Sequence, residues 1–315
     1  MTLRLGDYCG MELARLGDHD RRIWVLDGDL GDSNGATHFA QRHPDRFVMA
    51  GIAEQTMVSA AAGIASCGGR PWVFSFAAFL CYRAYDQIRM CLSQANQPVT
   101  LVGSHSGGCA GRNGRSHAAL NDLSLMTSLP NMTVWAPADP ADVRLAIRSI
   151  LQENRPAYLR LPRRPVDALP GRPARCRWLT DPRPVALLGT GLGTHLAFAA
   201  AAELSRRDEL VGLLHCPQVL PLPHTQLATL LRDVEHLVSI EDHYSSGGLG
   251  SLLQHAKLTP QTTIVGWPMH WTGKSGDDQQ LLSAHRLDAE SLADRVLDTL
   301  ANTSSSRPSS QRQTV

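Results

Sequence analysis

The sequence predicts an α/β protein of two consecutive domains, each a mainly parallel sheet flanked by helices. In both halves of the chain, short apolar runs typical of buried strands alternate with helical patterns, and this alternation indicates parallel sheets with right-handed crossovers. A segment with several prolines and few apolar residues separates the two halves. We therefore expect a first domain over 1–165, a linker over 166–184, a second domain over 185–300 and a disordered polar tail over 301–315.

The composition limits the classes of function. The chain has 315 residues, 43% of them hydrophobic, which is enough for two hydrophobic cores. A formal net charge of +1 gives no strong field for nucleic acid or an anionic membrane, and no run of about 18 apolar residues occurs. Seven cysteines without regular spacing are typical of reduced thiols in a cytosolic protein. We therefore expect a cytoplasmic protein that binds neither nucleic acid nor a membrane.

The first domain begins with a helix and a buried strand. Apolar and small residues at helical spacing predict a helix over 7–16, and the apolar run 23–26 predicts a strand that ends in a polar loop. Because ligands gather beyond the carboxyl ends of parallel strands, Asp29 and Ser33 in this loop are candidates for substrate contact. The alternative is a turn in which Asp29 and Asp32 cap the following helix.

The remaining elements follow from the same patterns. In the first domain they are strands within 47–50, 71–76, 98–103, 132–139 and 157–164 and helices over 55–65, 121–126 and 143–152. In the second domain they are strands within 185–194, 211–216, 236–241 and 262–267 and helices over 196–206, 225–231 and 289–300.

The stretch 51–89 carries the strongest functional signal, because it places one carboxylate, that of Glu54, at the start of a helix. Glu54 heads the helix predicted over 55–65, which is rich in small and apolar residues and should be packed on nearly every side. Downstream lie the aromatic residues Phe76, Phe79, Tyr82 and Tyr85. Taken separately, a glutamate at a helix start usually caps the helix, and clustered aromatic residues usually belong to the core. Together they suit the binding of a flat heteroaromatic cofactor.

A glycine-rich loop, HSGGCAGRNGRSHAAL, follows the strand predicted within 98–103. The loop contains His105, His117, two arginines and Asn113, and its glycines let the backbone approach a ligand closely. A histidine in a loop is most often a surface residue. Two of them beside several glycines, after a buried strand, favour a function, because imidazole moves protons near neutral pH.

Three segments carry a resemblance to a known family. They are GIAEQ at 51–55, FSFAAFLCYRAYDQIR at 74–89 and GRNGRSHAALNDLSLMTSLPNMTVWAPAD at 111–139. These segments are similar to the pyrimidine-binding domain of the transketolase family, a domain that deoxyxylulose-phosphate synthases and the beta chains of 2-oxo acid dehydrogenases share. The similarity extends over about 7–300 and keeps the family's order and spacing of motifs.

The resemblance implies thiamine diphosphate as the cofactor. Glu54 would hydrogen-bond to N1′ of the aminopyrimidine ring and so promote loss of the proton from C2 of the thiazolium. Phe79 would stack on the aminopyrimidine, with Phe76 and Tyr82 beside it.

The resemblance also implies a set of substrate residues. Ser33 and, more weakly, Arg4 would contact the substrate. His105 and His117 would face a ketose donor, and His117 would act in catalysis by hydrogen-bonding to the developing alkoxide. Arg163 resembles the family's sugar-phosphate arginine, whose guanidinium binds a phosphate in bidentate fashion.

Two positions depart from the family pattern. Asn113 stands where transketolases of the sugar-phosphate pathway carry an acidic residue that reads a substrate hydroxyl, and Ala118 stands where an amide is common. Asn113 remains a candidate substrate contact, and a donor or acceptor outside central metabolism becomes an alternative to the usual ketose phosphates. The neighbours of Arg163 in sequence, Arg160 and Arg164, are candidates for an interface.

Half of a thiamine diphosphate site is missing from the sequence. The family holds the diphosphate through Mg²⁺ with a domain marked by GDG and, about thirty residues later, an asparagine, because Mg²⁺ prefers such oxygen ligands. The chain contains no GDG. We therefore expect a separate subunit to supply the Mg²⁺ and diphosphate site, in an α2β2 heterotetramer, and we expect this chain to be inactive alone.

These inferences predict the C-terminal-half subunit of a two-component transketolase. It would move a two-carbon ketol unit from a ketose to an aldose, and we expect the ketose to be phosphorylated. The alternatives are the beta subunit of a 2-oxo acid dehydrogenase and a non-catalytic partner of a thiamine enzyme. The two-histidine loop and the arginine at a strand end favour polyol phosphates over small oxo acids.

Overall fold

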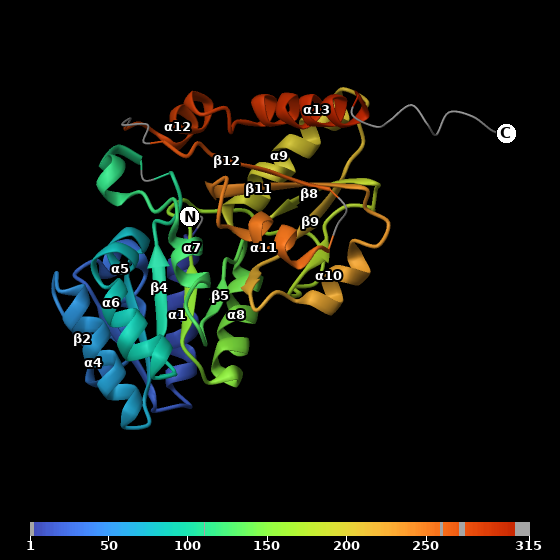
Figure 1. The fold of residues 1–315 in the computed structure, drawn as a ribbon. Coiled ribbons are helices and arrows are strands. Elements are labelled where there is room, and N and C mark those ends of the chain that lie inside the picture. Colours follow the sequence, from blue (N-terminus) through green and yellow to red (C-terminus); the bar gives the residue numbers. More distant parts are fainter. Residues whose placement is uncertain (1–2, 110, 259–260, 271–274, 306–315) are drawn as a thin grey trace.

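Two sheets organise the chain. A computed structural model describes residues 3–109, 111–258, 261–270 and 275–305, and within these residues the strands form a seven-stranded and a five-stranded sheet (Figure 1). The strands are β1 (Ile23–Asp27), β2 (Phe47–Met49), β3 (Arg70–Phe76), β4 (Thr100–Ser104), β5 (Thr133–Trp135), β6 (Ala157–Arg160), β7 (Arg177–Trp178), β8 (Val185–Gly189), β9 (Gly212–His215), β10 (Gln218–Leu220), β11 (His236–Tyr244) and β12 (Thr262–Trp267).

The helices lie between these strands. They are α1 (Leu5–Gly17), α2 (Gly31–Asn34), α3 (Thr37–Arg42), α4 (Glu54–Ser66), α5 (Ala77–Arg83), α6 (Tyr85–Gln87), α7 (Asp122–Thr127), α8 (Pro140–Glu153), α9 (Leu192–Arg206), α10 (His224–Leu230), α11 (Leu249–Ala256), α12 (Asp278–Ala284) and α13 (Ala289–Ser305). The short 3₁₀ helices η1 (Pro44–Arg46) and η3 (Gly111–His117) and the π-helix η2 (Ile88–Gln94) complete the set for the described residues.

The seven-stranded sheet is buried on both faces. Its order is β10-β5-β6-β4-β3-β1-β2, and all neighbouring strands are parallel except β10 and β5. Side chains alternate between two cores: on β3, Val73 packs under α4 and α5, whereas Trp72 and Phe74 pack under α1 and α8. This two-sided burial explains why the strands appear in the sequence as continuous apolar runs.

The five-stranded sheet has the order β12-β11-β8-β9-β7, with β7 as its antiparallel edge strand. Helices α9, α12 and α13 cover one face, and α10 and α11 cover the other (Figure 1). The predicted linker 166–184 therefore contains a strand of this sheet, because Arg177 and Trp178 pair with His215 and Leu214.

The two halves of the chain share structure. Strand β10 comes from the second half but joins the first sheet by pairing with β5. Cys109 and Leu120, which belong to the glycine-rich loop, are buried in the core of the second half together with Trp267. The junction between the sheets is thus a packed interface.

The fold corrects two expectations from the sequence. Helix α4 buries Met57, Val58 and Ala61, but its opposite face is exposed, so it is not packed on nearly every side. Helix α13 extends to Ser305, so 301–305 are helical where we expected a disordered tail, and the rest of that tail lies outside the described residues. Among the described helices, none is long and apolar enough to cross a membrane.

Candidate functional site

Glu54 lies at the first position of α4, just beyond the carboxyl end of β2. The turn into the helix passes through Gly51, whose φ of 71° lies in the left-handed region that favours glycine. Glu54 is 3% exposed, and its Oε1 atom accepts a hydrogen bond from Nη1 of Arg83 at 3.1 Å. The fold therefore buries one carboxylate and gives it one guanidinium as its charged partner.

Three ring side chains form a stack beside this carboxylate. Phe76 ends β3 and His105 follows β4, and because these parallel strands are neighbours, their rings stack with centroids 3.9 Å apart. Phe76 in turn stacks on Phe79 of α5, at 5.4 Å between centroids. The Cζ atom of Arg83 lies 4.0 Å from the centroid of the Phe79 ring. The order of the stack is therefore His105, Phe76, Phe79 and the guanidinium of Arg83.

His117 meets the stack from the side. Its ring makes edge contacts with Phe79 and Phe76, at 5.0 and 5.8 Å between centroids. Burial lowers the pKa of His117, and the positive charge of Arg83 lowers it further. The two histidines of the glycine-rich loop thus lie on the same aromatic pair.

His105 is held in its neutral form. Burial lowers its pKa to about 4, and the positive charges of Arg163, Arg4 and His117 add to the effect. At neutral pH a neutral imidazole has one nitrogen that donates and one that accepts a hydrogen bond. The site therefore offers a polar group without a second buried charge.

The second half of the chain anchors the glycine-rich loop. Asp242 at the end of β11 accepts hydrogen bonds at Oδ1 from the backbone N–H of Gly108, at 3.0 Å, and from Nε1 of Trp267, at 2.8 Å. Arg160 donates to the backbone oxygen of Asp242 at 2.7 Å and to Oδ2 of Asp122 at 2.8 Å. All four side chains are almost fully buried. The position of the histidine loop thus depends on contacts with the second sheet.

The predicted substrate residues lie in two groups. Ser33 is in α2, and its backbone oxygen accepts a hydrogen bond from Arg4 at 2.7 Å, while Asp7 holds the other side of the Arg4 guanidinium. Arg163 is half-exposed, with Nη1 3.6 Å from Oδ1 of Asp278. The positive charges of Arg163 and Arg4 both lower the pKa of His105, so both groups act electrostatically on the same histidine.

Asn113 and Tyr82 are further out. Asn113 is exposed in η3, between the two histidines in sequence. Tyr82 is 47% exposed and donates a hydrogen bond to Oδ1 of Asn121. Neither is in ring contact with the stack among the described residues. No group of three or more His, Cys, Asp or Glu side chains suited to a metal ion occurs in the described part of the chain.

The turn after β1 is held by Asp27, a residue that the sequence did not single out. Asp27, fully buried at the end of the strand, accepts hydrogen bonds from the backbone N–H of Leu30 at 2.7 Å and from Nδ2 of Asn34 at 2.6 Å. Asp29 has a φ of 67° within that turn. The turn that carries Ser33 is therefore organised by Asp27.

Sequence reasoning overlooked two contributors to the site. Arg83 lies four residues after Phe79, a helical spacing that places two side chains on one face, so the signal was present. Asp242 left no local signal, because its partners Gly108 and Trp267 are distant in sequence.

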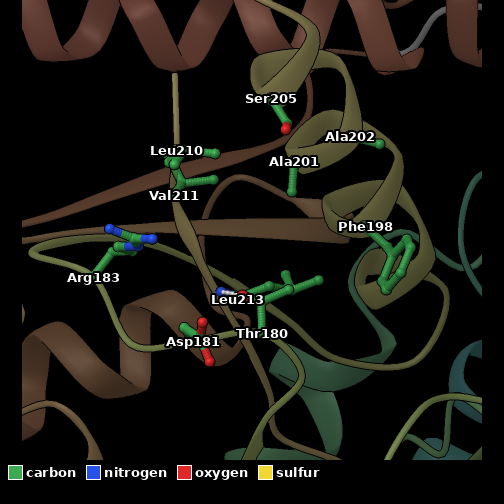
Figure 2. Close-up of a pocket in the computed structure, with 10 residues that line it drawn as sticks. All are labelled: Thr180, Asp181, Arg183, Phe198, Ala201, Ala202, Ser205, Leu210, Val211 and Leu213. Carbon is green, nitrogen blue, oxygen red and sulfur yellow. Dashed lines mark hydrogen bonds between the residues drawn. The ribbon is translucent and has the colours of Figure 1, made fainter. Parts of the chain in front are cut away.

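A separate hollow of about 260 Å³ lies on the second sheet, between α9 and the segments around Thr180 and Leu210. Figure 2 shows that its lining is mostly apolar, with Phe198, Ala201 and Val211 among the ten residues drawn. None of the residues of the aromatic stack lines it.

Comparison with known families identifies the fold. The family model "Transketolase, pyrimidine binding domain" matches residues 2–167, and the model "Transketolase, C-terminal domain" matches residues 175–292. The chain belongs to the transketolase family. Members of this family depend on thiamine diphosphate, and both the family and the two-sheet α/β fold predicted from the sequence are confirmed.

The chain spans about half the length of several transketolase relatives. It is 32% identical to mouse transketolase-like protein 2 over 92% of this chain and 48% of the relative. It is 33% identical to the 6-deoxy-6-sulfo-D-fructose transketolase subunit SqwH of Clostridium sp. over 76% of each chain. A solved structure described as a split gene transketolase, inactive beta4 tetramer, matches with a TM-score of 0.84 at 30% identity, covering 95% of this chain and 99% of the other.

Proposed function

We propose that this chain is the pyrimidine-binding subunit of a two-component, thiamine-diphosphate-dependent transketolase. The enzyme would transfer a two-carbon ketol unit from a ketose to an aldose. The observation that carries the proposal is the buried carboxylate of Glu54 beside Phe79, a ring on which a planar group can stack. His105 stacks on the neighbouring Phe76, and His117 contacts the edge of Phe79.

The residues of the site fit the aminopyrimidine of the cofactor. A planar, nitrogen-bearing group already lies there, since the guanidinium of Arg83 covers Phe79 and donates to Glu54. The aminopyrimidine ring would make the same two contacts: it would stack on Phe79 and donate a hydrogen bond to Glu54. When bound, thiamine diphosphate supplies a nucleophilic carbon for breaking and forming carbon–carbon bonds next to a carbonyl.

The chain's own residues then have distinct tasks. Glu54 would hold a proton at the ring nitrogen of the cofactor, which a buried carboxylate does well because few other partners compete for it. Phe79 would orient the ring, and Phe76 would support Phe79 by stacking on it. Tyr82 would border the cofactor from the same helix.

The substrate would lie on the histidine side of the site. His105 and His117 would hydrogen-bond to its carbonyl and hydroxyl oxygens, and His117, the more exposed of the two, would move the proton. Arg163 would bind an anionic group at the far end of the donor. Ser33 and Asn113 would contact hydroxyl groups.

An anionic donor is supported by the charges around the site. Arg163 and Arg4 both lower the pKa of His105, so both contribute positive potential on the histidine side of the site. The relative SqwH is named for a substrate that carries a sulfonate. We therefore propose a ketose with a terminal phosphate or a similarly charged group as the donor.

A partner subunit would complete the cofactor site. The chain lacks the GDG motif for the diphosphate and Mg²⁺, and it spans about half of the mouse relative. The exposed face of α4 and the 76% exposed Ile52 adjoin Glu54, where a second chain would cover the cofactor. We propose an α2β2 heterotetramer as the active form and a self-associated, inactive form of this chain alone, as in the inactive beta4 tetramer.

The test is to replace Glu54 with Gln in the assembled enzyme. This chain is mixed with a candidate subunit that carries GDG and a downstream asparagine, and thiamine diphosphate binding with Mg²⁺ is titrated by calorimetry. We expect tight binding only in the mixture. We expect Glu54→Gln to lower kcat for ketol transfer by about 10²- to 10⁴-fold, because an amide cannot hold the proton.

The matched control is Glu12→Gln, which makes the same chemical change on α1, where Glu12 pairs with Arg15. It should leave kcat unchanged. Full turnover in the Glu54→Gln enzyme would disprove the role of Glu54, and absence of cofactor binding in the mixture would disprove the proposed function.

A further inference from the structure

Arg83 occupies the point where the two proposed cofactor contacts meet. Its Nη1 atom lies 3.1 Å from Oε1 of Glu54, and its Cζ atom lies 4.0 Å from the centroid of Phe79. These are the carboxylate and the ring that the aminopyrimidine would use. A guanidinium resembles that ring in being flat and in carrying N–H donors at its edge.

The position of Arg83 follows from local structure. It is the last residue of α5 and lies one helical turn after Phe79, so its side chain reaches back over that ring. Gln55 of α4 donates a hydrogen bond to the backbone oxygen of Arg83 at 2.9 Å, which ties the end of α5 to the start of α4.

The guanidinium of Arg83 is one of two groups that stack on the Phe79 ring in the described part of the chain. Phe76 stacks on it at 5.4 Å between centroids, and the Cζ atom of Arg83 lies 4.0 Å from its centroid. A cofactor ring that stacks on Phe79 and also hydrogen-bonds to Glu54 would use both contacts of the guanidinium and would therefore take its place.

We propose that Arg83 substitutes for the aminopyrimidine in the chain without cofactor, and that thiamine diphosphate displaces its guanidinium from Glu54 and Phe79. This inference rests on the proposed function, because it takes the site around Glu54 to be the cofactor site.

The exposure of the two side chains explains why displacement is possible and why the contact exists. The Glu54 side chain is 4% exposed, so without a partner it would be a buried, unpaired charge, which is costly. The Arg83 side chain is 49% exposed and can rotate into water, where its charge is well solvated. Arg83 thus keeps the free subunit stable, and cofactor binding must overcome this contact.

The experiment measures cofactor affinity with and without the guanidinium. Calorimetric titration of thiamine diphosphate, in excess Mg²⁺, is carried out on the mixture with the diphosphate-binding subunit, for wild type, Arg83→Ala and Arg83→Lys. Cation–π contacts and half-exposed ion pairs are individually weak, so we expect Arg83→Ala to bind the cofactor roughly 5- to 20-fold more tightly than wild type. Arg83→Lys should fall between, because an ammonium keeps the charge but cannot stack as a plane.

The matched control is Arg89→Ala, which removes an arginine of similar exposure that pairs with Asp86 outside the site. Its cofactor affinity should equal that of wild type. If Arg83→Ala binds the cofactor no more tightly than wild type does, the proposal is overturned. Binding of the cofactor by wild type would in that case leave the proposed function intact. Absence of binding by wild type would instead remove the proposed function, and this inference with it.

A second measurement uses the free chain. Without its guanidinium partner, Glu54 is left buried and charged, so Arg83→Ala should lower the thermal unfolding midpoint of the chain alone by roughly 2–4 °C. In a Glu54→Gln background the same substitution should have little effect, because no charge then needs pairing. Equal effects in both backgrounds would show that Arg83 does not serve Glu54 and would overturn the proposal.

Discussion

At the residue scale, burial lowers the pKa of both histidines of the site, and neighbouring arginines lower it further. The pKa of His105 falls to about 4, first because of burial and then because of Arg163 and Arg4. An ordinary histidine in the unfolded chain titrates near about 6.5. Between these two pH values, His105 is therefore neutral in the folded protein but protonated in the unfolded chain.

This difference predicts a pH dependence of stability. Between about pH 6.5 and pH 4 the unfolded state binds a proton at His105 and the folded state does not, so the free energy of unfolding falls as the pH is lowered through that window. The loss should reach about 2 kcal/mol at pH 4.5 and should be absent above pH 7. His105→Asn removes the group with little backbone strain, because His105 has a φ of 54° and Asn tolerates the left-handed region. Urea denaturation at pH 7 and pH 4.5 should therefore show a smaller acid loss in the variant, and an equal loss would contradict the assignment.

At the element scale, α4 is packed on one side and open on the other. Its composition suggested burial all round, yet Gln55, Thr56, Ser59, Ala60 and Gly63 are exposed. Small side chains let another backbone approach closely, which is the property that a subunit contact beside Glu54 would need. The small and apolar composition of α4 is thus explained if its exposed face is buried only when the chain assembles with its partner subunit.

A bulky charge on this face should block assembly without unfolding the chain. We expect Ala60→Arg to weaken association with the diphosphate-binding subunit at least about 100-fold, because burying an unpaired guanidinium in an interface costs several kcal/mol. The stability of the free chain should change by less than about 0.5 kcal/mol, since Ala60 is exposed. Analytical ultracentrifugation of the mixture measures the association. Ala199→Arg, on the exposed side of α9, is the matched control, and equal association of both variants would argue against α4 as the contact.

At the scale of the whole molecule, buried ion pairs join the two sheets. Asp142 of α8, in the first half, accepts hydrogen bonds from Arg177 of β7 at 2.9 Å and interacts with His215 of β9 at 2.7 Å. Burial acts to raise the pKa of Asp142, but the hydrogen bond from His215 and the charges of His215 and Arg177 outweigh it and lower that pKa. The two halves therefore share their stability.

Removing this charge should destabilise both halves together. We expect Asp142→Asn to lower the free energy of unfolding by about 3 kcal/mol, because Arg177 would lose its closest carboxylate in a buried place. Asp86→Asn, which removes an exposed partner of Arg89, should cost less than about 1 kcal/mol. Urea denaturation followed by tryptophan fluorescence compares the two variants. If both variants lose a similarly small free energy of unfolding, the contact between the halves contributes little to stability.

The sequence alone determined the fold class, the family and most of the helices and strands. Both sheets consist of buried parallel strands, whose apolar runs and alternating helices are local signals that periodicity detects. The elements it missed are short: α2, β7 and β10 have two to four residues, and α3, α5, α11 and α12 have six to eight. The sequence also indicated Glu54, Phe76, Phe79, His105 and His117, because their motifs are contiguous, and the fold brings these five together.

Only the tertiary structure decided how those residues meet and what lies between them. The order of the strands placed Phe76 beside His105, and the packing of α5 on α4 brought Arg83 over Phe79 and onto Glu54. The anchor of the histidine loop on Asp242 joins residues more than a hundred positions apart. Such contacts depend on the arrangement of sheets and helices in space, whereas periodicity and motif spacing record only what neighbours along the chain can do.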